Sequence, residues 1–159
     1  MDKSISYSST MKIWKEAMGM IRAEIELINA GDLLMAKRHI IDEEEIKKVR
    51  TSMLVDTGSL YMCINELIQE QLQLTVMEKR PGQLADGRII QLDVVGPIEV
   101  RFKNRRCVVD AMVLPGNNEL LLGAIALEDM DVLIDPSRQE LIVNPEHPYR
   151  PQMCLKKAS

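Results

Sequence analysis

Residues 53–59 have the sequence Met-Leu-Val-Asp-Thr-Gly-Ser, and the rest of the chain is best interpreted from this stretch outward. Its three apolar residues end a predicted buried strand over Val49–Val55, and Asp56 follows at the mouth of a tight turn. Gly58 would allow the close backbone approach and the unusual dihedral angles of such a turn. Backbone N–H groups around Gly58 would then hydrogen-bond the Asp56 carboxylate. The stretch therefore predicts a carboxylate fixed at the end of a buried strand.

Two further elements strengthen this interpretation. Leu121-Leu-Gly123 is a second apolar stretch that ends in glycine, and a helix over Ala124–Met130 is predicted after it. Between the two stretches, strands over Val76–Ala85 and Arg88–Val95 flank Asp86-Gly87, a dipeptide that favours a tight hairpin turn. The sequence thus predicts a hairpin that lies, along the chain, between the Asp56 stretch and the Leu121-Leu-Gly123 stretch.

Alternating apolar and charged residues predict strands in most of the remaining chain. We expect strands over Ile21–Leu27, Ile98–Phe102, Cys107–Val113, Val132–Ile134 and Leu141–Val143, with the charges of 98–103 on an outer face. Turns or breaks are expected at Asn29–Asp32, Gly96-Pro97, Asn104-Arg105, Pro115–Asn118 and Asp135–Arg138. Asn65 would cap a short helix through Leu72, whereas residues 42–50 fit a short helix or a charged loop. The expected fold is a mostly β domain.

The composition limits the classes of partner. The chain has 159 residues, of which 46% are hydrophobic and 28% charged, as expected for one folded domain. A net charge of −4 gives no reason to expect a nucleic acid or a membrane as partner. The set Arg101, Lys103, Arg105 and Arg106 fits a solvated hairpin face better than an anion site.

The cysteines and histidines predict neither disulfides nor a metal site. Three cysteines without CxxC spacing are accompanied by two histidines without suitably spaced partners, so we expect His39 and His147 to lie on the surface. The chain also has no apolar run of membrane-spanning length. Reduced thiols and the lack of such a run lead us to expect a cytoplasmic protein without a cofactor. The methionines would fill an aliphatic core; those expected there are Met35, Met53, Met62, Met112 and Met130.

The combined pattern resembles the retropepsin-like (retroviral-type, clan AA) aspartic proteases, and more narrowly their small bacterial members. The resemblance lies in Leu54-Val-Asp-Thr-Gly-Ser59, the glycine-tipped hairpin and Leu121-Leu-Gly123 with its helix, supported by Ala23–Asp32 and by Cys63-Ile-Asn65. It covers residues 18–145. Residues 1–17 would then be a mobile N-terminal extension, and residues 146–159 a proline-containing tail.

The resemblance implies a closed β-barrel-like lobe with a flap hairpin and one or two short helices. Asp56 would be the catalytic aspartate, Thr57 would join two catalytic loops through its hydroxyl, and Gly58 would support the carboxylate. Substrate would contact Ser59 and the flap tip, and Leu122 and Gly123 would lock the catalytic loop from behind. The flap would span about 77–92; its tip residues are Ala85, Asp86, Gly87 and Arg88.

The chain length sets the expected assembly. An aspartic protease uses two carboxylates that share a proton across an activated water, because like charges about 3 Å apart cannot both ionise. The sequence contains one apolar-Asp-Thr-Gly stretch, and 159 residues are too few for two pepsin-like lobes. The resemblance therefore implies a homodimeric endopeptidase with Asp56 of each chain on the two-fold axis, acting on peptide or protein substrates.

The sequence departs from viral members at three positions, and the last two of these keep a second hypothesis open. Ser59 replaces the commoner alanine, Ala124 stands where an arginine often follows the glycine, and Gly87 is the single glycine of the flap tip. The alternative is a non-catalytic dimeric module that binds a peptide or protein on the same fold. A structural turn aspartate is a further alternative for Asp56, whereas an actin-like phosphate loop would need a far longer chain.

Overall fold

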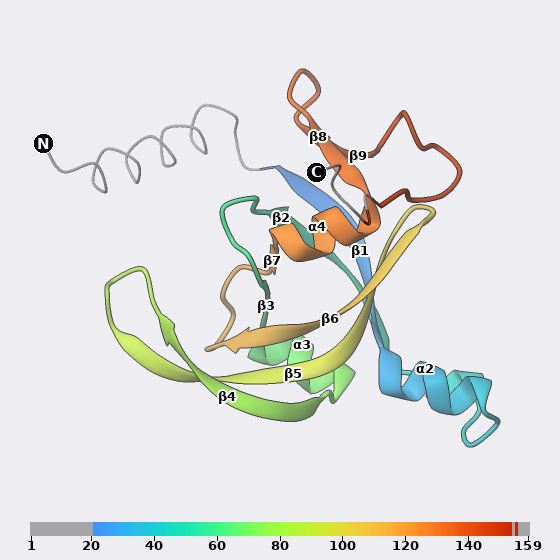
Figure 1. Cartoon of the computed structure of the whole chain (residues 1–159). Coiled ribbons are helices and arrows are strands. Elements are labelled where there is room, and N and C mark those ends of the chain that lie inside the picture. Colours follow the sequence, from blue (N-terminus) through green and yellow to red (C-terminus); the bar gives the residue numbers. More distant parts are fainter. Residues whose placement is uncertain (1–20, 154, 156–159) are drawn as a thin grey trace, which may run out of the picture.

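The computed structural model of the chain describes residues 21–153 and 155 (Figure 1). The expected N-terminal extension over 1–17 lies outside these residues. In chain order the elements are β1 (Arg22–Asn29), α2 (Ala30–Lys37), the 3-10 helix η1 (Glu43–Glu45), β2 (Lys48–Val55), β3 (Met62–Asn65), α3 (Glu66–Leu72), β4 (Thr75–Gln83), β5 (Ile89–Phe102), β6 (Arg105–Leu114), β7 (Leu121–Leu122), α4 (Ala124–Met130), β8 (Val132–Asp135) and β9 (Glu140–Val143).

The main sheet closes on itself. Its strands follow the order β1-β2-β7-β3-β6-β5-β4, and β1 also pairs with β5, so every strand except β4 belongs to a closed ring. Inward-facing aliphatic side chains fill this ring, and Ile25, Met53, Ile64 and Leu122 are completely buried. The expected mostly β fold with a barrel-like lobe is thus observed, and the barrel core is aliphatic as the composition predicts.

The short hairpin β8–β9 forms a second sheet outside the barrel. Figure 1 shows it beside α4, near the start of β1. The prediction of a helix over Ala124–Met130 is confirmed residue for residue. The last hairpin is confirmed as well, with strands that differ from the expected ones by one residue.

Asn65 is the expected cap of α3, and its side chain does two things. Its Oδ1 accepts the N–H of Ile68 (2.9 Å), and its Nδ2 donates to the carbonyl of Asn118 (2.9 Å). The four residues before the helix form β3, a strand that the sequence analysis missed because its partner β6 lies far along the chain. Asn65 therefore joins a helix start to the loop that precedes β7.

The turn expected at Asn29–Asp32 is wrong, because Asn29 instead caps the helix α2. Its Oδ1 accepts the N–H of Asp32 (3.1 Å), while its Nδ2 donates to the carbonyl of Leu72 (3.0 Å). Residues 42–50 were expected to form a short helix or a charged loop, and neither fits fully. The 3-10 helix η1 covers a single turn, and β2 begins already at Lys48. Figure 1 shows α2 projecting from the barrel.

Two expectations for the charged strands are also wrong. Gly96-Pro97 does not end a strand; β5 continues through it with a bulge between Val95 and Ile98. Glu99 lies on the expected outer face, opposite the exposed Val108, but it is buried there, because Arg101 Nε (2.6 Å) and Arg106 Nη2 (2.7 Å) cover its carboxylate from both sides. Such pairing is what allows a charge to be buried.

The expectation of a solvated basic face is wrong for Arg105, which lies inside the protein. It begins β6 instead of forming a turn, and it is 1% exposed. Among the expected core methionines, Met35 is exposed and Met112 half-buried, whereas the other three are buried. In the part of the chain that the structure describes, no helix is both long and apolar enough to cross a membrane.

Candidate active site

Strand β2 carries Asp56 into a buried position at its end. Neighbouring strands hold this end through backbone hydrogen bonds: the Val55 N–H donates to the Ile21 carbonyl (2.8 Å), and the Leu54 N–H donates to the Leu120 carbonyl (2.9 Å). Asp56 itself donates its N–H to the carbonyl of Leu122 (3.0 Å). Although Asp56 is charged, it is only 8% exposed. Its position is therefore fixed from both neighbouring strands.

The turn after Asp56 holds its carboxylate in the expected way. Gly58 donates its backbone N–H to Asp56 Oδ1 (3.0 Å), and the Ser59 N–H donates to the Asp56 carbonyl (3.1 Å). The expectation of an unusual backbone at Gly58 is wrong: among the described glycines, positive φ occurs at Gly87 and Gly116. Thr57 is exposed, and no described residue forms a hydrogen bond with its hydroxyl.

Leu122 and Gly123 lie against this turn, as the resemblance implied. The first two N–H groups of α4 donate to the carbonyls of Ser59 (2.8 Å) and Leu60 (3.2 Å). A Cβ on Gly123 would lie 2.5 Å from the Tyr61 carbonyl oxygen and 2.9 Å from that of Leu60. This backbone-to-backbone approach is possible only for glycine.

The hairpin of β4 and β5 differs from this loop in its exposure. Nearly all of β4 is exposed, and the tip carries the expected residues Ala85 to Arg88. Within the tip, Asp86 Oδ1 accepts the Arg88 N–H (3.0 Å), and Gly87 has φ 87°. Figure 1 shows the tip reaching out from the barrel on the side of the loop between β2 and β3. The two regions meet where the Arg80 guanidinium lies 5.7 Å from the Tyr61 ring centroid.

Cys63 is a buried neighbour of the site that the sequence analysis did not select. Burial, followed by the nearby charge of Asp56, raises the pKa of its thiol. Because a thiol with a raised pKa stays protonated, Cys63 is not a candidate nucleophile. No group of three or more His, Cys, Asp or Glu among the described residues could hold a metal ion.

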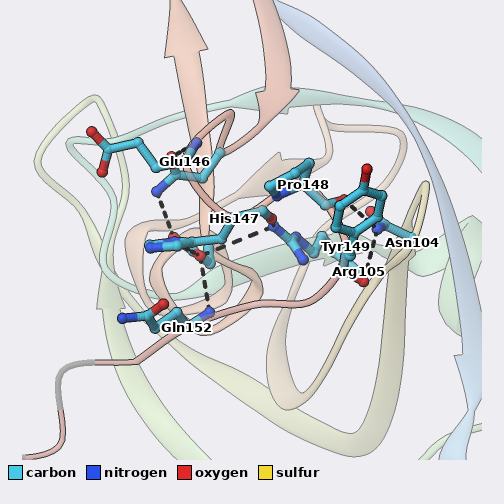
Figure 2. A network of polar contacts seen from close by, with 9 residues as sticks. Asn104, Arg105, Glu146, His147, Pro148, Tyr149 and Gln152 are labelled. Atoms are coloured by element: carbon cyan, nitrogen blue, oxygen red, sulfur yellow. Dashed lines mark hydrogen bonds and ion pairs between the residues drawn. The ribbon is translucent and has the colours of Figure 1, made fainter.

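The C-terminal tail is held by a polar cluster that sequence reasoning missed (Figure 2). Asp131, the C-cap residue that follows α4, accepts the Gln152 N–H (3.0 Å) and the Asn144 amide (2.9 Å), and lies 2.7 Å from His147 Nδ1. These partners, led by Gln152, lower the pKa of Asp131 from 3.8 to about 2. His147 is therefore not a plain surface residue, whereas His39 is exposed as expected.

Arg105 completes this cluster, which we call the tail clasp (Asp131, Asn144, His147, Gln152 and Arg105). Its Nη2 donates to the His147 carbonyl and lies 4.0 Å from Asp131 Oδ2. Nothing in the local sequence signalled the clasp, because its members come from β6, α4 and the tail. It anchors the segment after β9 against the barrel and supports the C-terminal end of α4.

Comparison with known proteins fits this geometry. No curated protein matches the chain. A family model described as aspartyl protease matches residues 43–126, which is more than half of the chain and includes the Asp56 turn, the hairpin and Leu122-Gly123. This match supports the retropepsin-like clan. The chain belongs to the aspartyl protease family.

Proposed function

We propose that this protein is a homodimeric aspartic endopeptidase in which Asp56 of each chain supplies one catalytic carboxylate. The observation that carries the proposal is the single Asp56 turn, braced by Leu122 and Gly123, in a chain of the aspartyl protease family. One such turn per chain provides half of an active site.

In the proposed mechanism the two Asp56 carboxyl groups share one proton and hold a water between them. One carboxylate takes a proton from the water, which attacks the peptide carbonyl carbon, while the other carboxyl group protonates the carbonyl oxygen. Collapse of the resulting tetrahedral diol breaks the C–N bond, and the amine leaves with a proton. The pair acts as a unit, so neither role belongs to one chain.

The second copy would cover an apolar groove that begins beside Asp56. The groove has a volume of about 330 Å³ and is lined by Thr57, Ala124, Leu127, Glu128, Val132, Leu133, Ile134 and Leu141. Because two Asp56 carboxylates must come within about 3 Å, the neighbouring Thr57 must also be covered by the partner. Leu133, which is 46% exposed, is an apolar side chain available for that contact.

Thr57 would join the two loops across the two-fold axis. Its hydroxyl has no hydrogen-bond partner among the described residues and can both donate and accept. Two symmetry-related threonines could therefore bond each other's loop. Substrate would lie as an extended peptide between Ser59 and the flap tip, which is formed by Ala85, Asp86, Gly87 and Arg88.

We also propose a cytoplasmic location. Cys63 and Cys107 are both buried and unpaired. Free thiols in a folded protein suit a reducing compartment. Burial, the largest cause, raises the pKa of Cys107 to about 12, so its thiol is unreactive.

Replacement of Asp56 tests the activity directly. Asp56→Asn keeps the oxygen that accepts the Gly58 N–H but removes the carboxylate, so hydrolysis of a peptide library at mildly acid pH should fall by about 10²- to 10⁴-fold. Asp93→Asn, a surface change on β5, is the control. Hydrolysis by Asp56→Asn at the wild-type rate would contradict the proposal. A folded wild-type dimer that binds peptides without cleaving them would support the binding module instead.

Replacement of Leu133 tests the dimer. Leu133→Glu should give a monomer by light scattering and should abolish hydrolysis, because its carboxylate would be buried in a groove that already contains Glu128. Val108→Glu on β6 changes a residue of nearly equal exposure, 45%, away from the groove, and should leave the dimer intact. A Leu133→Glu protein that stays dimeric and active would show that the partner binds elsewhere.

A further inference from the structure

A small pocket lies where the catalytic loop meets the flap strand. Its volume is about 140 Å³, and its walls are Tyr61 from the loop, Arg80 from β4, Val94 from β5, and Asp110, Ala111 and Met112 from β6. A cavity of about 150 Å³ holds one benzene molecule, so this pocket has room for a single long side chain. It opens between the two elements that would flank a bound peptide.

The floor of the pocket is apolar. Val94 is 6% exposed and Ala111 is 2% exposed, and Met112 is half-buried beside them. The exposed Tyr61, from the loop that follows Asp56, forms another wall. These surfaces suit the aliphatic stem of a long side chain rather than a small polar one.

The two charged residues of the pocket differ in whether their charge is already neutralised. The Arg80 guanidinium forms an ion pair with Glu78 on its own strand and lies over the Tyr61 ring. Asp110 is exposed, and no described residue forms an ion pair or a side-chain hydrogen bond with it. The uncompensated charge of the pocket is therefore negative.

The Asp110 side chain lies opposite Gly96. A Cβ on Gly96 would lie 2.1 Å from Asp110 Oδ1, so the carboxylate lies directly over the backbone of β5, at the bulge. With glycine at position 96, the carboxylate can occupy this place without a clash. The carboxylate therefore lines the pocket beside the β5 bulge.

We propose that this pocket is a subsite for a lysine or arginine side chain of the substrate, and that Asp110 selects it. This inference rests on the proposed endopeptidase function, because it places the peptide between the Asp56 loop and β4. The aliphatic stem would lie on Met112 and Ala111, with its cationic head at Asp110. The substrates would be peptides with a basic residue at one fixed position relative to the cleaved bond.

The test compares peptides that carry lysine, its uncharged isostere norleucine, or glutamate at each position around the cleavage site. Wild-type protein should prefer lysine over norleucine at one position by about fivefold in kcat/KM, the value of about 1 kcal/mol for an exposed ion pair. Glutamate should be the poorest there, and added salt should reduce the preference. The absence of such a position would overturn the inference while leaving the proposed hydrolysis intact.

Asp110→Asn assigns the preference to this residue, since the amide keeps the shape beside Gly96. The lysine preference should disappear, so that kcat/KM for the lysine peptide becomes equal to that for the norleucine peptide. Asp93→Asn is the matched control: it removes the same charge next to Val94, but Asp93 pairs with Lys79 and lines a different pocket. A preference that survives Asp110→Asn would overturn the inference.

A binding experiment separates this inference from the proposed activity. If wild-type protein cleaves none of the peptides, the proposed function fails. The affinities of Asp56→Asn protein for the labelled lysine and norleucine peptides are then measured. A preference for lysine that is lost when Asp110→Asn is added to Asp56→Asn would support the subsite even then. Equal affinities would overturn it.

Discussion

The turns that contain Asp56 and Asp86 are locally alike and differ in everything that surrounds them. In each, the aspartate Oδ1 accepts a backbone N–H two residues further on, at 3.0 Å: from Gly58 in one turn and from Arg88 in the other. The Asp56 turn is then braced by β1, β7 and α4, whereas the Asp86 turn bonds mainly within itself. Local sequence can make the turn, but contacts from distant parts of the chain turn it into a fixed site.

The largest effect is expected for the glycine that braces the first turn. Gly123→Ala would bring a Cβ within 2.5 Å of the Tyr61 carbonyl oxygen, and because backbone must then move, the free energy of unfolding should fall by about 3 kcal/mol. Gly87→Ala at the exposed tip meets no atom within 4 Å and should cost about 1 kcal/mol for its positive φ. Urea denaturation of the two variants measures the difference. Equal losses would mean that the two turns are supported alike.

Asn65 should come next, because it braces the same region from the other side. Asn65→Ala removes the cap of α3 and the bond to Asn118, so unfolding free energy should fall by about 2 kcal/mol. Asp86→Ala removes a similar side-chain-to-backbone bond in the exposed tip and should cost about 0.5 kcal/mol. Thermal unfolding compares the pair, and a larger loss for Asp86→Ala would contradict the contrast.

The sequence was informative where structure depends on neighbouring residues. The Asn65 cap, the Asp86-Gly87 hairpin and α4 could be predicted because their signals lie within a few positions. The helix after Asn29 was missed although its capping bond to Asp32 is local, because its apolar residues follow no regular helical spacing. The strand β3 was missed, since its partner β6 lies more than 40 residues away. Burial of Glu99 and Arg105 was missed for the same reason: a charged residue alternating along a strand predicts exposure unless its distant partners are known.

At the candidate site, the sequence could indicate which residues would gather but not how they would be braced. Asp56, Leu122 and Gly123 were selected through the family resemblance, and the structure brings them together. The pocket around Asp110 could not be anticipated, because Tyr61, Arg80 and Asp110 come from three separate elements. Only the folded sheet, in which β5 pairs with both β4 and β6, places them side by side.

Acid denaturation should reveal the contribution of Asp131, which caps the C-terminal end of α4. The Gln152 N–H, the Asn144 amide and His147 lower the pKa of Asp131 to about 2. A carboxylate with a depressed folded-state pKa contributes stability above its unfolded value of 3.8, and that contribution is lost as pH falls from about 4 to about 2. Asp131→Asn should therefore be less stable at neutral pH and should lose less stability over that interval. If the unfolding free energies of wild type and Asp131→Asn change with pH in parallel, Asp131 makes no pH-dependent contribution to stability.

The smallest effect on stability is expected where the two regions touch. Arg80→Gln removes a cation over an exposed ring and a surface ion pair, so the unfolding free energy should change by only about 0.5 kcal/mol. Local opening of β4 should respond more strongly, because few other side-chain contacts hold this exposed strand. Hydrogen exchange of residues 75–83 should speed up, while exchange in β2 and β7 stays unchanged. Lys79→Gln, on the same strand and paired with Asp93, is the control. If exchange of β4 stays at the wild-type rate in Arg80→Gln, the hairpin is held by its pairing with β5 alone, and the contact with Tyr61 does not stabilise it.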